Sequence, residues 1–206
     1  MSSERLDEAR RGTGSGIAFV VTGPSGAGKT SVINRVMGEL PALAFSVSHT
    51  TRTRREGESA GADYVFIGED EFERLVRAGE FVEHTVYSGN RYGTTREQLD
   101  EAFARGNDII LNVEVEGAKR LREIGLPGHP IVFVFLAPST LDRLAKRLRT
   151  RGTESEAKIS ERIAVAAREM IALNSFDYLV LNDDLDAAVA ELSSIITAER
   201  LRIANG

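Results

Sequence analysis

Four short apolar runs, separated from one another by helical patterns, constrain the fold of this 206-residue chain most strongly. The runs are IAFVVT (17–22), IILNVEV (109–115), IVFVFLA (131–137) and YLVL (178–181). Continuous apolar runs of this length are typical of strands that are buried on both faces of a parallel sheet. Helical patterns cover residues 29–39, 95–105, 117–124, 139–150, 155–173 and 184–203. This alternation predicts an α/β fold whose parallel sheet is flanked by helices.

Residues 45–92 interrupt the alternation and show a different pattern. FSVSHTTRT, DYVFI and FVEHTVY are typical of half-buried strands, and Gly-containing turns separate them. One short helical pattern, DEFERLVRAGE, lies among them. We therefore expect a small mixed α/β lobe inserted into the α/β core.

The composition excludes several partners and locations. The formal net charge is −5, whereas nucleic-acid binders are usually basic, so no nucleic-acid partner is expected. The chain has no cysteine, which excludes disulfides and fits a reducing cytoplasm. The longest apolar run, at 131–137, is too short to span a bilayer. The first 16 residues lack the apolar segment of a signal peptide, so residues 1–16 are expected to form a flexible tail of a cytoplasmic protein without a membrane partner.

A phosphate-binding motif follows the first apolar run directly. Residues 23–30, GPSGAGKT, satisfy G-x-x-x-x-G-K-[ST] between a predicted strand and a predicted helix. Backbone N–H groups of such a loop, together with the helix dipole, bind phosphate oxygens. The lysine reaches the β- and γ-phosphates, and the threonine hydroxyl can ligate Mg²⁺. The motif predicts a Mg²⁺-dependent nucleoside triphosphate site, with Thr30 as the metal ligand, formed by Gly23, Pro24, Ser25, Gly26, Ala27, Gly28, Lys29, Thr30 and Ser31.

An arginine cluster in the predicted lobe suggests a second anion site. Arg52, Arg54 and Arg55 fall within four residues of an acidic protein. Because a guanidinium binds phosphate through two parallel hydrogen bonds, such a cluster can hold a phosphomonoester. Tyr64 offers a further hydroxyl donor nearby in the sequence. The alternative is a solvated turn, since runs of charge usually face water.

Glu83 lies inside an alternating apolar strand pattern. A glutamate there either faces solvent or is buried beside a partner that satisfies it. Guanine is such a partner, because its N1–H and N2–H₂ are adjacent donors that match a carboxylate. Hydroxyl groups at Ser48 and Thr94 would then contact the rest of the base.

Taken together, these stretches resemble the guanylate kinase family. GPSGAGKT, SVSHTTRTRREGESAGADYVFI, FVEHTVYSGNRYGTT, RLRTRGTES and LNDDLD follow the order and spacing of that family, from about residue 17 to about residue 196. The resemblance implies a P-loop NTPase core, a GMP-binding lobe, a helical lid and the reaction ATP + GMP ⇌ ADP + GDP. It implies the boundaries 17–47 (core), 48–95 (lobe), 96–138 (core), 139–165 (lid) and 166–206 (core), all in one guanylate-kinase-like unit.

The resemblance also implies a role for individual positions. The guanine would be contacted by Ser48, Glu83 and Thr94, the GMP phosphate by Arg52, Arg55, Tyr64 and Tyr92, the ATP phosphates by Arg147, Arg151 and Arg162, and the adenine by Asn182. Lys29, Arg52 and the three lid arginines would be catalytic. Arg54 falls where many relatives carry proline and is left out. Asn112 replaces the first acid of an acid-x-acid pair common in the family, and Glu114 keeps the second, in the GMP site.

Two other functions fit parts of the sequence. A related P-loop kinase that acts on a phosphorylated sugar would leave Ser48, Glu83 and Thr94 without a purpose. A non-catalytic guanylate-kinase-like module that binds phosphorylated partners would typically have a degraded phosphate loop, whereas this loop is intact. The sequence does not distinguish a monomer from a homodimer.

Overall fold

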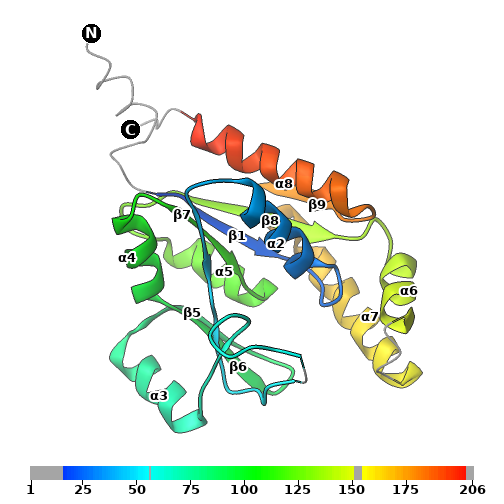
Figure 1. Ribbon diagram of the computed structural model, residues 1–206. Helices are drawn as coiled ribbons and strands as arrows, with labels where there is room; N and C mark the ends of the chain where they lie inside the picture. Colours follow the sequence, from blue (N-terminus) through cyan, green and yellow to red (C-terminus); the bar gives the residue numbers. More distant parts are fainter. Residues whose placement is uncertain (1–15, 56, 151–154, 203–206) are drawn as a thin grey trace.

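The computed structural model describes residues 16–55, 57–150 and 155–202, and these form a mixed α/β structure (Figure 1). Its core sheet has five parallel strands in the order β2-β7-β1-β8-β9. These are β1 (Ala18–Thr22), β2 (Leu43–Ser46), β7 (Asp108–Asn112), β8 (Ile131–Ala137) and β9 (Tyr178–Leu181). The α/β class and the parallel sheet predicted from the sequence are confirmed.

Helices cover both faces of the core sheet, so the core has three layers (Figure 1). On one face lie α2 (Lys29–Glu39) and α8 (Leu185–Arg200), and on the other α4 (Arg96–Ala104) and α5 (Val115–Ile124). Side chains alternate along β1, so that Phe19 and Val21 pack in the cluster of α2 and α8, whereas Ala18 and Val20 pack in that of α4 and α5. All four are fully buried, which explains the continuous apolar run.

A second sheet lies beside the core and carries the arginine cluster and Glu83. Its strands β3 (His49–Thr50), β4 (Val65–Phe66), β5 (Phe81–Tyr87) and β6 (Asn90–Thr95) are ordered β4-β3-β6-β5. Helix α3 (Glu69–Ala78) packs on β5 through the buried Phe72. We call residues 48–95 the lobe from here on.

Two helices project from the far end of the core sheet (Figure 1). They are α6 (Leu141–Thr150) and α7 (Glu156–Ile171), and the 3₁₀ helix η1 (Ala172–Ser175) leads from α7 toward β9. Leu144 and Leu148 of α6 pack against Ile159 and Ala166 of α7. Arg151, predicted as a catalytic residue, and the predicted tail up to residue 15 lie outside the described residues. Across the described ranges, no helix combines the length and apolarity needed to cross a bilayer.

Two expectations about strands were wrong, and one strand was missed. The run 109–115 is not one strand, because β7 ends at Asn112 and α5 already begins at Val115, which is apolar because it is buried in the first turn of that helix. The stretch 45–53 is not one strand of the lobe either, since its beginning belongs to β2, which pairs with β7 in the core sheet. Strand β6 was not predicted. It forms a hairpin with β5 through Ser88 and Gly89, which both have positive φ angles.

Candidate functional site

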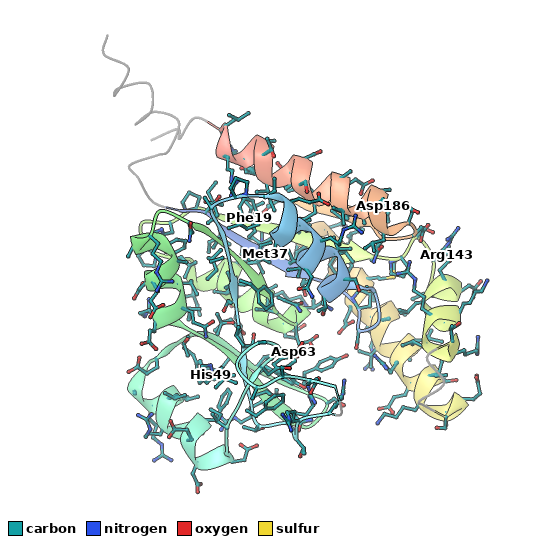
Figure 2. The ribbon with its side chains drawn as sticks, viewed as in Figure 1. Phe19, Met37, His49, Asp63, Arg143 and Asp186 are labelled. Carbon is teal, nitrogen blue, oxygen red and sulfur yellow. The ribbon has the colours of Figure 1, made fainter. Side chains whose placement is uncertain are left out.

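A cleft between the core and the lobe is lined by the phosphate loop on one side and by predicted acceptor residues on the other. Its lining from the core is Ser25, Gly26, Gly28, Lys29, Thr30, Ser31, Asn112, Val113 and Glu114, and from the lobe Ser48, Arg52, Arg55, Glu58, Asp63, Tyr64, Glu83, Thr85, Tyr87 and Tyr92. The structure thus brings together residues that are up to 89 positions apart in the sequence, from Ser25 to Glu114. A second hollow lies on the other side of the loop and is lined by Arg147 and Asn182. Asp63, at the cleft, and Arg143, at the hollow, lie well apart in Figure 2.

The phosphate loop connects β1 to α2, and its glycines at positions 23, 26 and 28 all have positive φ angles. Gly23 has a φ of 140°, and a Cβ there would lie 1.9 Å from the carbonyl oxygen of Leu136. Gly28 has a φ of 92° and precedes the first residue of α2, so the loop delivers the N-terminus of that helix to the cleft. The ammonium group of Lys29 donates to the carbonyl oxygen of Gly23 at 2.5 Å. Loop, lysine and helix N-terminus therefore converge where the motif requires a triphosphate.

On the side of the hollow, polar side chains from distant elements bond to this loop. The side-chain amide of Asn182, which follows β9, donates to the carbonyl oxygen of Ala27 at 2.7 Å. The guanidinium of Arg147, on α6, donates to the same oxygen at 3.1 Å and also to the carbonyl oxygen of Asn182. From α7, Arg162 donates to the hydroxyl of Ser25 at 2.6 Å. Three of the predicted donor-side residues therefore surround the loop.

In the lobe, Glu83 is buried and only 4% exposed, so the alternative of a solvent-facing glutamate is wrong. One carboxylate oxygen accepts from the hydroxyl of Thr94 at 2.9 Å. The other oxygen, Oε2, is buried without a hydrogen-bond partner among the described residues. Burial raises the pKa of Glu83 to about 7, although the bond from Thr94 and the charge of Arg120 lower it. The predicted Ser48 is also buried and lines the cleft.

The space for the Glu83 carboxylate depends on Gly117 in the first turn of α5. A Cβ at Gly117 would lie 2.5 Å from Oε2 of Glu83. Any larger residue would therefore push the carboxylate away. Sequence reasoning missed Gly117, because its importance arises only from the packing of α5 against β5.

The arginine cluster divides into two kinds of residue. The side chain of Arg52 is only 10% exposed, is paired with Glu58 at 2.8 Å, and lies over the ring of Tyr64 at 5.2 Å. Arg55 is exposed and lines the cleft. Arg54 is also exposed and does not line it, so exposure to solvent, the alternative interpretation, applies to Arg54 and Arg55 but not to Arg52. The predicted Tyr64 and Tyr92 lie edge to face, with ring centroids 6.0 Å apart, and burial raises the pKa of Tyr64 to about 12.

Two acids near the phosphate loop each have a buried, unpaired oxygen. Glu114 precedes α5, and Glu169 lies near the end of α7. Burial and the charge of Glu114 raise the pKa of Glu169 to about 7, while Lys29 lowers it. Sequence reasoning missed Glu169, because nothing distinguishes it from the other acidic residues of the predicted helix. Thr30, the predicted metal ligand, is exposed in the first turn of α2. The described residues contain no group of three or more His, Cys, Asp or Glu side chains that could hold a metal ion.

Comparison with known proteins shows the family. The sequence profile described as guanylate kinase matches residues 16–199. The chain belongs to the guanylate kinase family. A protein named guanylate kinase from Desulfotalea psychrophila is 43% identical over 187 residues, covering 91% of this chain and 91% of that protein. Another of the same name, from Symbiobacterium thermophilum, is 43% identical over 193 residues, covering 93% and 90%.

A solved structure agrees with these sequences. The crystal structure of guanylate kinase from Anaplasma phagocytophilum superposes with a TM-score of 0.76 at 30% identity. The match covers 91% of this chain and 88% of that one. Because nearly the whole chain is included, the guanylate kinase fold extends over core and lobe together.

Proposed function

We propose that this chain is a nucleoside monophosphate kinase that transfers the γ-phosphoryl group of ATP to GMP, giving ADP and GDP. Its membership of the guanylate kinase family supports this activity. One structural observation carries it: the cleft that contains the phosphate loop also contains a buried carboxylate with an unpaired oxygen, Oε2 of Glu83. A buried unpaired acceptor is costly unless a donor fills it, and the N–H edge of guanine supplies such donors.

The acceptor nucleotide is proposed to lie along the lobe. Its base would meet Glu83 and Thr94, which already share a hydrogen bond, and the buried hydroxyl of Ser48. The phosphate of GMP would contact the arginines and tyrosines that line the same cleft, Arg52, Arg55, Tyr64 and Tyr92. Glu114 completes this proposed set.

The donor nucleotide is proposed to lie around the loop and extend toward the second hollow. Lys29 and the backbone N–H groups of residues 23–31 would hold its phosphates. Arg147 and Arg162, which bond to this loop, would neutralise the transferring group, and Asn182, which lines the hollow, would contact the adenine. Arg151 belongs to the same proposal from the sequence alone.

The residues at the loop fit Mg²⁺ as the cofactor. The hydroxyl of Thr30 would hold the ion, and the unpaired oxygens of Glu114 and Glu169 are the hard ligands that Mg²⁺ and its water molecules prefer. Bound Mg²⁺ neutralises charge on the phosphates of ATP.

The chemistry needs no general base, because the acceptor is already a phosphate oxygen. That oxygen attacks the γ-phosphorus, a new O–P bond forms, and the bond to the β–γ bridging oxygen breaks, leaving ADP. The barrier comes from bringing two anions into line, so positioning and charge neutralisation by Lys29 and the arginines provide the catalysis. His49 and His84 lie in lobe strands, and His129 stacks on Phe103, so none is needed for proton transfer.

Further aspects stay predictions from the sequence. These are the boundaries at 17–47, 48–95, 96–138, 139–165 and 166–206, a role in purine nucleotide metabolism, a cytoplasmic location, the absence of nucleic-acid and membrane partners, and a monomeric or homodimeric state.

An acceptor panel tests the proposal. ADP release from ATP and Mg²⁺ would be measured with GMP, AMP, CMP, UMP and a sugar phosphate. We expect turnover with GMP far above that with the others. Turnover with the sugar phosphate alone would favour the sugar-phosphate kinase. Failure of calorimetry to detect Mg-ATP binding would favour the non-catalytic module.

A further inference from the structure

The carboxylate of Glu58 holds together the segment that carries the two phosphate-site arginines. Its oxygens accept from the guanidinium of Arg52 at 2.8 and 3.1 Å. The second of these oxygens also accepts from the backbone N–H of Arg55 at 2.8 Å. One side chain thus fixes the guanidinium of the first arginine and the backbone of the second. The side chains of Glu58 and Arg52 are only 19% and 10% exposed, so this pair is shielded from water more than a surface ion pair.

We propose that Glu58 is a positioning residue for the acceptor phosphate, which orients Arg52 and Arg55 without contacting the substrate itself. The inference rests on the proposed function and deepens it, because it explains how a phosphomonoester site is built in an acidic chain.

The hydrogen bonds of Arg52 show which edge of its guanidinium is left for a ligand. A guanidinium has five N–H groups. The two N–H groups of Nη1 are used by Glu58 and by the carbonyl oxygen of Thr53, at 3.1 and 2.8 Å, and one N–H of Nη2 is used by Glu58. The Nε–H and the second Nη2–H take no part in the bonds to Glu58 and Thr53. They lie side by side on the opposite edge, as a fork that matches two oxygens of a phosphate.

The surroundings keep that edge in place. The guanidinium of Arg52 lies over the neighbouring rings of Tyr64, at 5.2 Å, and Phe66, at 5.7 Å. The hydroxyl of Tyr92 interacts with the same guanidinium. A long, flexible side chain is therefore ordered by two rings and a carboxylate, so little freedom is left to lose when a phosphate binds.

The pKa values agree with a permanently ionised pair. Burial raises the pKa of Glu58, but the hydrogen bonds from Arg52 and from the backbone of Arg55 more than reverse this and leave it lowered. Burial likewise lowers the pKa of Arg52, and Glu58 and Tyr92 more than offset it. Glu58 therefore presents acceptor oxygens only and cannot release Arg52 by becoming protonated near neutral pH.

An opposite role for Glu58 makes a different prediction. If its negative charge merely competed with the phosphate for Arg52, removing that charge would free the arginine and lower the KM for GMP. If Glu58 positions the arginines, removing the charge raises that KM. The sign of the change distinguishes the two roles.

The test is steady-state kinetics of Glu58→Gln, with the KM for GMP and for ATP measured separately. We expect the KM for GMP to rise roughly 10- to 100-fold, the range that follows from losing a hydrogen bond between charged groups. We expect the KM for ATP to change less than about twofold, because the hydrogen bonds of this pair among the described residues all lie within the lobe. Glu58→Asp, which keeps the charge on a shorter side chain, should recover part of the loss even if the Gln variant folds poorly.

Glu71→Gln is the matched control. Glu71 makes a similar two-bond pair with Arg74, at 2.7 and 2.9 Å, but that pair is exposed on α3. This variant should leave both KM values unchanged. In the Arg52→Lys background, Glu58→Gln should add little, because the fork it orients is gone.

The outcomes separate this inference from the proposed function. Wild-type protein that turns over GMP, with a KM unchanged or lowered in Glu58→Gln, overturns the positioning role and leaves the function intact. Wild-type protein that does not phosphorylate GMP overturns both. Equal rises in the KM for GMP and ATP would indicate a general loss of structure and would also overturn the inference.

Discussion

Replacing Glu83 by glutamine should change how the stability of this protein depends on pH. The Glu83 carboxyl has a pKa of about 7, compared with an ordinary value of 4.5, because burial disfavours its ionised form. Nearby Glu114 raises the pKa further, while Arg120 and the hydroxyl of Thr94 lower it. Glutamine has nearly the same shape but does not titrate, so Glu83→Gln isolates the contribution of ionisation.

The sign and the size follow from linkage. The folded protein holds the Glu83 proton more tightly than the unfolded chain, so this group adds stability fully below about pH 4.5 and loses it as the pH rises through about 7. Raising the pKa of Glu83 from 4.5 to about 7 corresponds to roughly 3 kcal/mol in the free energy of unfolding. Glutamine does not titrate, so the free energy of unfolding of Glu83→Gln should rise by roughly 3 kcal/mol relative to that of wild type between pH 5 and pH 8.

Urea unfolding of both proteins at pH 5 and pH 8 provides the measurement. Other carboxyls contribute equally to wild type and variant and cancel in the comparison, including Glu169, whose pKa is also raised to about 7. Glu71→Gln serves as the control, since the bond from Arg74 lowers the pKa of that exposed carboxyl, so it titrates below pH 5 and this variant should follow wild type between pH 5 and pH 8. Parallel pH dependences of wild type and Glu83→Gln would refute the reasoning.

Three further substitutions test single contacts. Gly117→Ala should displace Oε2 of Glu83, 2.5 Å from the added Cβ, and raise the KM for GMP about tenfold or more. Gly38→Ala, whose Cβ meets nothing within 4 Å, is its control, and equal kinetics of the two variants would contradict the role of Gly117. Gly28→Ala should abolish Mg-ATP binding in calorimetry, because a Cβ there would lie 2.4 Å from the amide nitrogen of Asn182 at a φ of 92°. Arg147→Lys should raise the KM for ATP about tenfold with little change in the KM for GMP, since an ammonium cannot make the same pair of bonds to Ala27 and Asn182. A rise in the KM for GMP alone would contradict the proposal that Arg147 acts on ATP.

The central strands could be predicted because burial on both faces leaves a continuous apolar run. β1 and β8 are almost entirely buried, and their predicted ranges match the structure closely. The second half of β2, Phe45 and Ser46, was assigned to the lobe, because β2 lies at the edge of the core sheet and is mostly only partly buried, as the strands of the lobe are. A sequence pattern indicates how much of a strand is buried, but it does not identify the sheet to which the strand belongs.

The candidate site could be predicted where its residues are contiguous. The phosphate loop is a single segment of the chain, so its sequence motif is enough to predict its conformation. Glu169 and Gly117 gave no comparable signal, because each acquires its position from a helix packed against a distant part of the chain. For Glu83 the sequence left both burial and exposure open, and only the packing of β5 against α5 decides between them.

On the two sides of the cleft the cationic side chains are bonded to different kinds of acceptor, and this difference affects how much the protein must rearrange when each nucleotide binds. On the donor side, Lys29 and Arg147 bond to neutral carbonyl oxygens. A phosphate oxygen is a stronger acceptor than these, so ATP can replace them at a net gain. On the acceptor side, Arg52 is bonded to the carboxylate of Glu58. A carboxylate and a phosphate are both charged acceptors, so a phosphate does not displace Glu58 from Arg52 at a net gain. The donor cations must therefore reorient when ATP binds, whereas the GMP phosphate meets a fork that is already set, and its association should need less rearrangement of the protein than that of ATP.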